Sequence, residues 1–340
     1  NIIAAISLSA AVIILYTLFF QPTQKEINNQ ISDSENIVSN NSEAPSLELI
    51  EQTPKINRED AINASKRIKF ENNNVLGSIS LEGAVIDDLR FKKYKTELNG
   101  NENIVLLNPR DVENGYIVET GWASNSKNID LPNYNTIWNI KGNTVLTPTS
   151  PITLSWTNNQ NITFIKKISI DDQFLFTIKQ SVTNSTNNKY NFYTYGQIIR
   201  NKAPEITNFY ILHEGLLGVF DDNLIEEDYD DIQEKKYSIT ANSGWLGITD
   251  KYWITSLIPQ EGNQFKADFD YKNKFRANFI ETNGKEASPS TTISNEIKII
   301  IAAKEVDVVD GYAEKLNISK FDLAIDWGFL YFLTKPIFLI

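Results

Sequence analysis

The sequence predicts a mainly β protein: one large antiparallel β-sandwich, with a transmembrane helix before it and helices after it. Between residues 66 and 304, short runs alternate apolar and polar residues, as strands with one buried face do. Turn-forming pairs such as Asn99-Gly100 and Asn283-Gly284 separate these runs, and no helices alternate with them. Both ends of the chain are apolar.

The first stretch, residues 1–20, is apolar except for Asn1, Ser7, Ser9, Tyr16 and Thr17. Its length is close to the roughly 20 residues that cross a bilayer core. A cleaved signal peptide has a shorter apolar core and small residues at its cleavage site, whereas this run ends in aromatic residues, glutamine and proline. We therefore expect an uncleaved transmembrane anchor, with a signal peptide as the alternative. Since Met is absent even at position 1, we expect the chain to be a fragment cut inside apolar segments at both ends.

Residues 21–65 are polar, rich in Ser, Asn and Glu, and poor in aromatic residues. Such a composition does not bury enough apolar area to fold. We expect a flexible linker here, which lets the next domain stand away from the membrane.

The central region, residues 66–304, carries the strand pattern. Even spacing of many short strands predicts an antiparallel sandwich. The clearest runs are residues 78–81, 115–119, 161–168, 174–178, 190–195, 237–240 and 297–301.

The pattern becomes helical at residue 305. Apolar residues recur at helical spacing up to residue 317, so we predict a connecting helix over residues 305–318. Residues 321–340 then read as an amphipathic helix lying in a membrane interface, where aromatic rings and a long lysine side chain are favoured. The alternatives are the start of a spanning helix and a buried core helix. The predicted interface residues are Trp327, Phe329, Tyr331, Phe332, Lys335 and Phe338.

Composition and motifs argue against several function classes. The net charge of −11 disfavours nucleic-acid binding. The chain has no Cys and a single His, His213, which rules out thiolate and multi-histidine metal sites. We interpret His213 as a structural residue at a turn and the acidic stretch 221–231 as a solvated loop. Because no nucleophile elbow or phosphate-binding glycine loop occurs, we predict no enzyme activity, no metal and no cofactor.

A binding module is the rival interpretation. A membrane-anchored β-sandwich could hold a carbohydrate or an apolar peptide in a cleft. Five tryptophans could line such a cleft, although we expect them to be core residues because Trp is highly buried on average. They are Trp122, Trp138, Trp156, Trp245 and Trp253.

An ordered set of motifs resembles the N-terminal part of the bacterial YidC membrane protein insertase family. Residues 77–94 resemble the family's first strand pair, and residues 162–171 and 174–184 its central hairpin. Residues 243–253, followed by Pro259, resemble its Gly-Trp segment. Residues 326–332 and 335–338 resemble the segment that leads into the insertase core. Each motif is weak alone, but their order covers nearly the whole chain.

The resemblance implies a function that the residues alone do not show. It implies an inner-membrane protein with its N-terminus inside, a periplasmic β-supersandwich and an interfacial helix at the outer leaflet. It further implies aid to the insertion and folding of nascent membrane proteins, with or without the Sec translocon and its accessory subunits. The family's five-helix core, with a hydrophilic groove and one arginine, would follow Ile340, so no groove residue is carried over to this chain.

Overall fold

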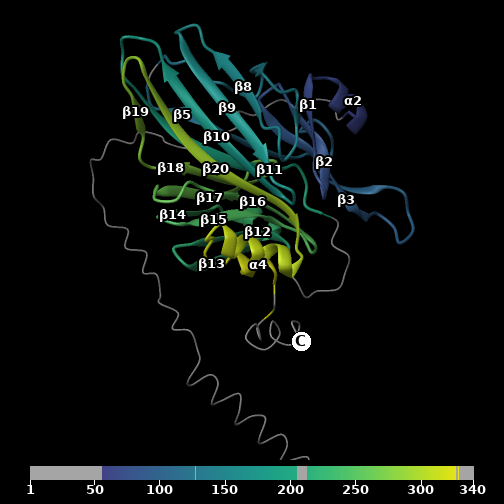
Figure 1. Ribbon diagram of the computed structural model, residues 1–340. Helices are drawn as coiled ribbons and strands as arrows, with labels where there is room; N and C mark the ends of the chain where they lie inside the picture. Colours follow the sequence, from purple (N-terminus) through teal and green to yellow (C-terminus); the bar gives the residue numbers. More distant parts are fainter. Residues whose placement is uncertain (1–55, 127, 205–212, 327, 329–340) are drawn as a thin grey trace, which may run out of the picture. The chain divides into compact units, whose positions relative to one another are not determined.

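The structure is a computed structural model that describes residues 56–126, 128–204, 213–326 and 328 (Figure 1). The predicted anchor, most of the linker and most of the predicted interfacial helix lie outside these residues. Among the helices of the described residues, none is long and apolar enough to cross a membrane.

Twenty strands of the described chain form two sheets, and the predicted mainly β sandwich is confirmed. The larger sheet has the order β14-β17-β18-β11-β5-β3-β2-β1-β7, with β4 beside β3 and β19 beside β11. Its strands are β1 (Arg67–Glu71), β2 (Val75–Ser80), β3 (Val85–Lys95), β4 (Asn103–Leu107), β5 (Tyr116–Ser124), β7 (Val145–Leu146), β11 (Tyr190–Arg200), β14 (Tyr237–Ala241), β17 (Phe265–Tyr271), β18 (Phe275–Glu281) and β19 (Lys285–Ala287).

The smaller sheet has the order β13-β12-β15-β16-β20-β10-β9-β8-β6. Its pairs are all antiparallel, whereas the larger sheet includes one parallel pair, β1 with β7. Its strands are β6 (Asn139–Lys141), β8 (Ile152–Thr157), β9 (Ile162–Ile170), β10 (Leu175–Asn184), β12 (Gly215–Phe220), β13 (Asn223–Asp228), β15 (Gly244–Thr249), β16 (Trp253–Ile258) and β20 (Thr291–Ala303).

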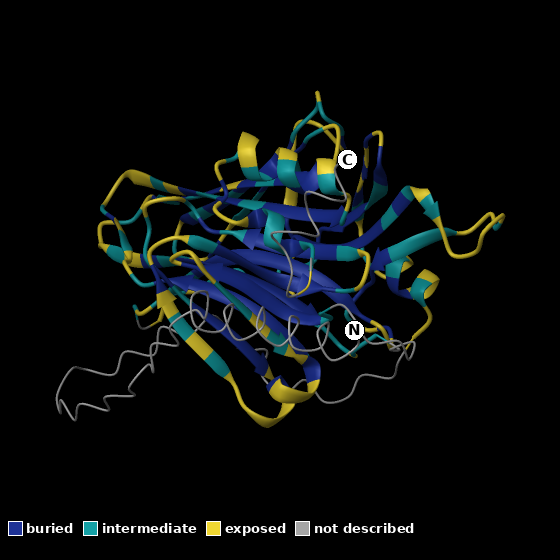
Figure 2. Cartoon of the chain, turned by 90° about the horizontal axis from the view of Figure 1, so that it is seen from below, coloured by how far each residue is buried: buried dark blue, intermediate teal, exposed yellow. Residues whose placement is uncertain are grey.

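One apolar core lies between the two sheets, and Figure 2 shows buried residues running along the strands of both. Aromatic rings meet across it. Phe70 of β1 lies edge-on to Phe176 of β10, with ring centroids 5.2 Å apart. Phe164 of β9 contacts Phe192 of β11 in the same way at 5.9 Å. The rings face the core because side chains alternate along a strand: the even-numbered residues of β9 are buried and the odd-numbered ones are not.

Short helices complete the described chain: α2 (Arg58–Asn63), α3 (Tyr229–Glu234), α4 (Val306–Lys315) and the 3₁₀ helix η1 (Phe321–Ala324). Helix α2 lies within the stretch expected to be linker. It is capped by Asn57, whose side chain accepts from the Asp60 N–H at 2.9 Å. Its Arg58 pairs with Asp88 of β3, so this part of the stretch is tied to the sheet.

The interpretation of residues 221–231 as a loop is wrong. Only Asp221 and Asp222 form the turn of a hairpin, and the acidic residues after them belong to β13 and α3. The backbone of β13 is ordered because it pairs with β12. Since β13 lies at the edge of its sheet, its acidic side chains still remain largely solvated.

Candidate functional site

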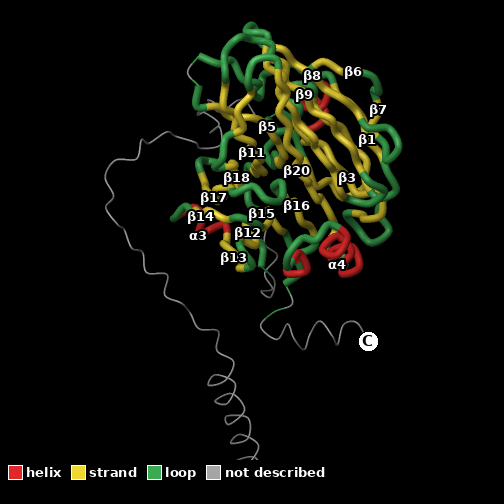
Figure 3. Tube along the Cα trace, turned by 60° about the vertical axis from the view of Figure 1, so that its left-hand side comes forward, coloured by secondary structure: helices red, strands yellow, loops and turns green. Residues whose placement is uncertain are grey.

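The predicted interface residues Trp327, Phe329, Tyr331, Phe332, Lys335 and Phe338 all lie outside the described residues. What the structure describes is the junction before them, formed by α4, η1 and the residues up to Asp326. Figure 3 shows α4 at one end of the strands. Helix α4 falls within the stretch for which the sequence predicts a connecting helix.

Helix α4 is fixed to the turn between β9 and β10. Its residues Val308, Val309 and Tyr312 are buried. The Tyr312 hydroxyl donates to the carboxylate of Asp171, 3.0 Å away, and accepts the backbone N–H of Phe174 at 2.8 Å. Burial raises the pKa of this hydroxyl far above its ordinary value, so it stays protonated and keeps donating. The turn and the helix therefore move together.

The 3₁₀ helix η1 is fixed to β15. Phe321 is fully buried and lies edge-on to the Trp245 ring, with centroids 5.0 Å apart. The Trp245 indole N–H donates to the carbonyl of Ser319 at 3.2 Å. Lys320 reaches the carbonyl of Asp222 in the β12–β13 turn at 2.6 Å. Apolar and polar contacts thus hold both sides of η1.

The last contacts before the undescribed segment come from Asp326. Its Oδ2 accepts the backbone N–H of His213 at 3.0 Å, and its Oδ1 accepts the N–H of Gly328 at 2.7 Å. His213 in turn places Nδ1 3.1 Å from Asp228 Oδ1. His213 therefore has a structural role: it links the start of β12 to Asp326, where the chain leaves the domain.

Charged side chains lie around Asp326, where the chain leaves the domain. Burial lowers the pKa of Lys304 to about 8, although the negative charges of Asp250, Asp326, Glu214 and Glu226 act to raise it. Its ammonium donates to the Thr249 hydroxyl at 3.0 Å. Burial, helped by Asp326 and Asp228, raises the pKa of Glu226. Lys304, just before the junction, is thus a half-buried lysine with four acidic residues around it.

A second feature lies between the sheets, in a row of buried polar side chains. Lys166, Gln180 and Asn295 are neighbours on β9, β10 and β20. All three are nearly fully buried. Lys166 Nζ donates to the carbonyl of Thr120 at 2.6 Å, and Gln180 Nε2 to the carbonyl of Gly121 at 3.0 Å. We call these three residues the polar row.

The third member of the polar row also bonds to the larger sheet, because Asn295 Nδ2 donates to Glu281 Oε1 of β18 at 2.6 Å. The three bonds therefore cross from the smaller sheet to the larger one. Burial lowers the pKa of Lys166 to about 8, and Glu119 opposes this shift. Sequence reasoning missed this row.

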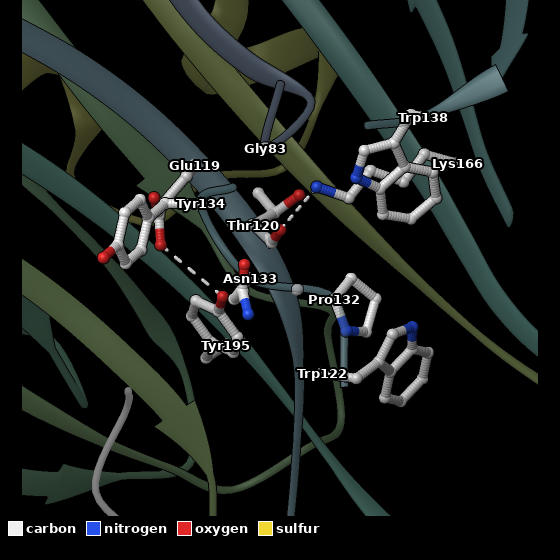
Figure 4. Close-up of a pocket in the computed structure, with 11 residues that line it drawn as sticks. Gly83, Glu119, Thr120, Trp122, Pro132, Asn133, Tyr134, Trp138, Lys166 and Tyr195 are labelled. Carbon is white, nitrogen blue, oxygen red and sulfur yellow. Dashed lines mark hydrogen bonds between the residues drawn. The ribbon is translucent and has the colours of Figure 1, made fainter. Parts of the chain in front are cut away.

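A small cavity lies at the Lys166 end of the row (Figure 4). Trp122, Trp138, Tyr134 and Tyr195 line it, and Figure 4 shows Lys166 reaching the backbone of Thr120 beside Trp138. Its volume is about 20 Å³. A pocket for a drug-sized ligand needs roughly 300–1,000 Å³, so this cavity has room for water only.

The five tryptophans are mainly core residues, as expected. Trp122, Trp138 and Trp245 are at most 3% exposed. Trp156 and Trp253 are half-buried and pack against the same core. Trp253 stacks on Phe91, with ring centroids 4.6 Å apart. Among the five, Trp122 and Trp138 also line the small cavity.

The acidic pair Asp87-Asp88 lies in β3. Adjacent strand residues normally point to opposite faces, yet both carboxylates are buried. A bulge between β2 and β3 leaves Asp87 out of register. Each carboxylate has its own arginine: Asp87 pairs with Arg67, and Asp88 with Arg58. The pair is therefore a structural anchor for β1 and α2.

Comparisons with known proteins identify relatives of this chain. The family model for the YidC periplasmic domain matches residues 67–340. A membrane protein insertase YidC from Pelagibacter ubique is 58% identical over 340 residues, which is all of this chain and 61% of that protein. One from Rickettsia bellii is 38% identical over 347 residues, covering 99% of this chain and 61% of the relative.

Solved structures are more distant. A galactose mutarotase related enzyme from Lactobacillus acidophilus aligns with 70% of this chain and 97% of its own, at 12% identity and a TM-score of 0.49. A likeness of this size carries no information about chemistry. The chain spans about 61% of the length of the two insertase relatives. Because the family model covers most of the chain, the chain belongs to the YidC family, with residues 67–340 matching the model of that family's periplasmic domain.

Proposed function

We propose that this chain is the membrane-tethered periplasmic part of a membrane protein insertase, and that it acts without enzymatic chemistry. The observation that carries the proposal is the match to insertase relatives along the whole chain. Its partners are then nascent membrane proteins, the lipid bilayer, and the Sec translocon with its accessory subunits. Its place is the bacterial inner membrane, with the β domain in the periplasm.

The junction supplies the physical reason for an accessory role. Helix α4, η1 and Asp326 fix the chain to both the β9–β10 turn and β15 before it enters residues 327–340. In this proposal those residues lie in the membrane interface, through Trp327, Phe329, Tyr331, Phe332, Lys335 and Phe338. A rigid junction then fixes the orientation of the β domain relative to the bilayer.

An insertion assay tests the proposal. Residues 1–340 replace the matching part of the Pelagibacter ubique insertase, and the chimera is produced in cells depleted of their own insertase. We expect it to restore membrane insertion of a small single-span protein. If the chimera is made and membrane-bound but restores nothing, the proposal is wrong. A second chimera without residues 67–305 then measures how much the β domain contributes.

The rival function, a carbohydrate-binding module, gains no support from the cavity. A volume of about 20 Å³ does not admit a sugar ring. A glycan panel that quenched tryptophan fluorescence would nevertheless restore this interpretation.

A further inference from the structure

The hairpin of β3 and β4 projects from the body of the sandwich, and we call its outer part, residues 90–105, the arm (Figure 1). Figure 2 shows that its tip is exposed. Leu98, in the turn, is 93% exposed. The turn is ordered, because Thr96 N–H donates to the Glu102 carbonyl and Gly100 N–H to the Glu97 carbonyl, both at 3.0 Å. The fold therefore holds a large apolar side chain in solvent at the end of a projection.

The arm is basic although the chain is acidic. Arg90, Lys92, Lys93 and Lys95 lie within six positions, against the two acidic residues Glu97 and Glu102 in the arm. Lys95 Nζ donates across the arm to the Asn101 carbonyl at 3.2 Å, which keeps its ammonium near the tip. Lys93 is exposed and has no ion-pair partner among the described residues.

Lys92 and Arg90 are less free. Lys92 pairs with Glu71 at 2.7 Å, and Arg90 lies 3.9 Å from Asp88. The charge available to a partner is therefore carried mainly by Lys93 and Lys95.

The base of the arm is tied to the junction. Phe91 stacks on Trp253, and Tyr94 lies edge-on to the same ring at 5.1 Å. The Tyr94 hydroxyl donates to Glu305, the residue that caps α4. Beside Trp253, Tyr252 is 58% exposed, and Lys251 Nζ lies 5.1 Å from its ring. Leu98 and Tyr252 thus lie at the end of the domain where α4 begins. Lys93, Lys95 and Lys251 lie at the same end.

We infer that the arm rests on an anionic lipid surface, with Leu98 entering the interface and Lys93, Lys95 and Lys251 facing lipid phosphates. An apolar tip flanked by lysines matches such a surface in both charge and polarity. A protein partner fits less well, because a standard interface buries about 800 Å² on each side and the arm is a two-stranded hairpin. The inference rests on the proposed membrane-tethered function.

The absence of cysteine allows a direct test. A single cysteine, Leu98→Cys, carries a fluorophore in the full chain, 1–340, reconstituted into vesicles that contain brominated quencher lipids. The vesicles hold either equal phosphatidylglycerol and phosphatidylcholine, or phosphatidylcholine alone. The control is Asn187→Cys, in the β10–β11 turn beside Asn184, which pairs with Thr291 at the far end of β20. The 13 residues of β20 span roughly 40 Å.

We expect strong quenching at position 98 in the anionic vesicles, several-fold less in the neutral ones, and none at position 187. Lys93→Glu with Lys95→Glu should reduce the quenching at 98 to the level of position 187. A matched change, Lys167→Glu with Lys179→Glu, reverses two exposed lysines paired across β9 and β10 and should have no effect.

Three results overturn the inference. The first is equal quenching at 98 and 187, and the second is quenching that ignores lipid charge. The third is shielding of position 98 only after a membrane-protein extract is added, which identifies a protein as the partner. Flotation separates the two proposals. A chain that floats with vesicles but shows no quenching at 98 refutes the arm alone, whereas a chain that does not float refutes both.

Discussion

Lys304 gives the sharpest quantitative prediction, because its charge is buried in the folded protein. Its pKa falls to about 8 beside the junction, against about 10.4 in an unfolded chain. The folded state therefore binds this proton more weakly than the unfolded state does. The penalty on folding is fully present below pH 8 and fades as the pH rises toward 10.4. Lys304→Met removes the penalty at every pH.

The size of the effect follows from the two pKa values. One pKa unit corresponds to ~1.4 kcal/mol, so the penalty is about 3 kcal/mol at pH 7.5 and about 1 kcal/mol at pH 9.5. The unchanged protein should therefore gain about 2 kcal/mol relative to Lys304→Met between these two pH values. Titration of Lys166 cancels, since both proteins contain it.

Urea unfolding, followed by tryptophan fluorescence at pH 7.5 and 9.5, measures this difference. Lys179→Met, at an exposed position, is the control and should change with pH as the unchanged protein does. If the stabilities of the unchanged protein and Lys304→Met change in parallel between the two pH values, Lys304 is not desolvated and the reasoning is wrong.

Three further variants test the junction and the bulge by urea unfolding. Phe321→Ala leaves a cavity under η1 and should cost about 3–5 kcal/mol, with a red shift of Trp245 emission; unchanged emission would show that η1 does not pack on this ring. Tyr312→Phe removes the acceptor of the buried Phe174 N–H and should cost about 1–3 kcal/mol; a neutral result would mean that water replaces the hydroxyl. Gly77→Ala places a Cβ 1.9 Å from the Asp88 carbonyl and should cost about 2 kcal/mol or more, and wild-type stability would contradict the close approach.

Local pattern located seven of the twenty strands in the described chain, because each run named above overlaps one strand: β2, β5, β9, β10, β11, β14 or β20. Residues 161–168 and 174–178 are two of these runs, and β9 and β10 form there as an antiparallel pair. The order of strands in the sheets was not predictable, because β10 pairs with β20 across more than a hundred residues and no local pattern records that choice. The family resemblance supplied the architecture instead.

The polar row shows a signal that was present and overlooked. Lys166 is in phase with Phe164 and Ile168 on β9, so the alternation alone placed it in the core. Helix α2 was missed for another reason. Its six residues are too few to be stable alone, and its Arg58 depends on Asp88, which is 30 positions away.

The polar row also bears on how the domain could orient a membrane segment. Buried polar groups seldom stabilise a fold more than apolar ones of the same shape. Stability alone therefore does not account for the three cross-sheet bonds of the polar row. The arm belongs to the larger sheet, through β3 and β4. The junction is fixed to the smaller sheet, through β15 and the β9–β10 turn. Directional bonds from Lys166, Gln180 and Asn295 fix the position of one sheet relative to the other. If the arm and the segment after the junction both contact the bilayer, as proposed above, these bonds keep the two in one fixed relation.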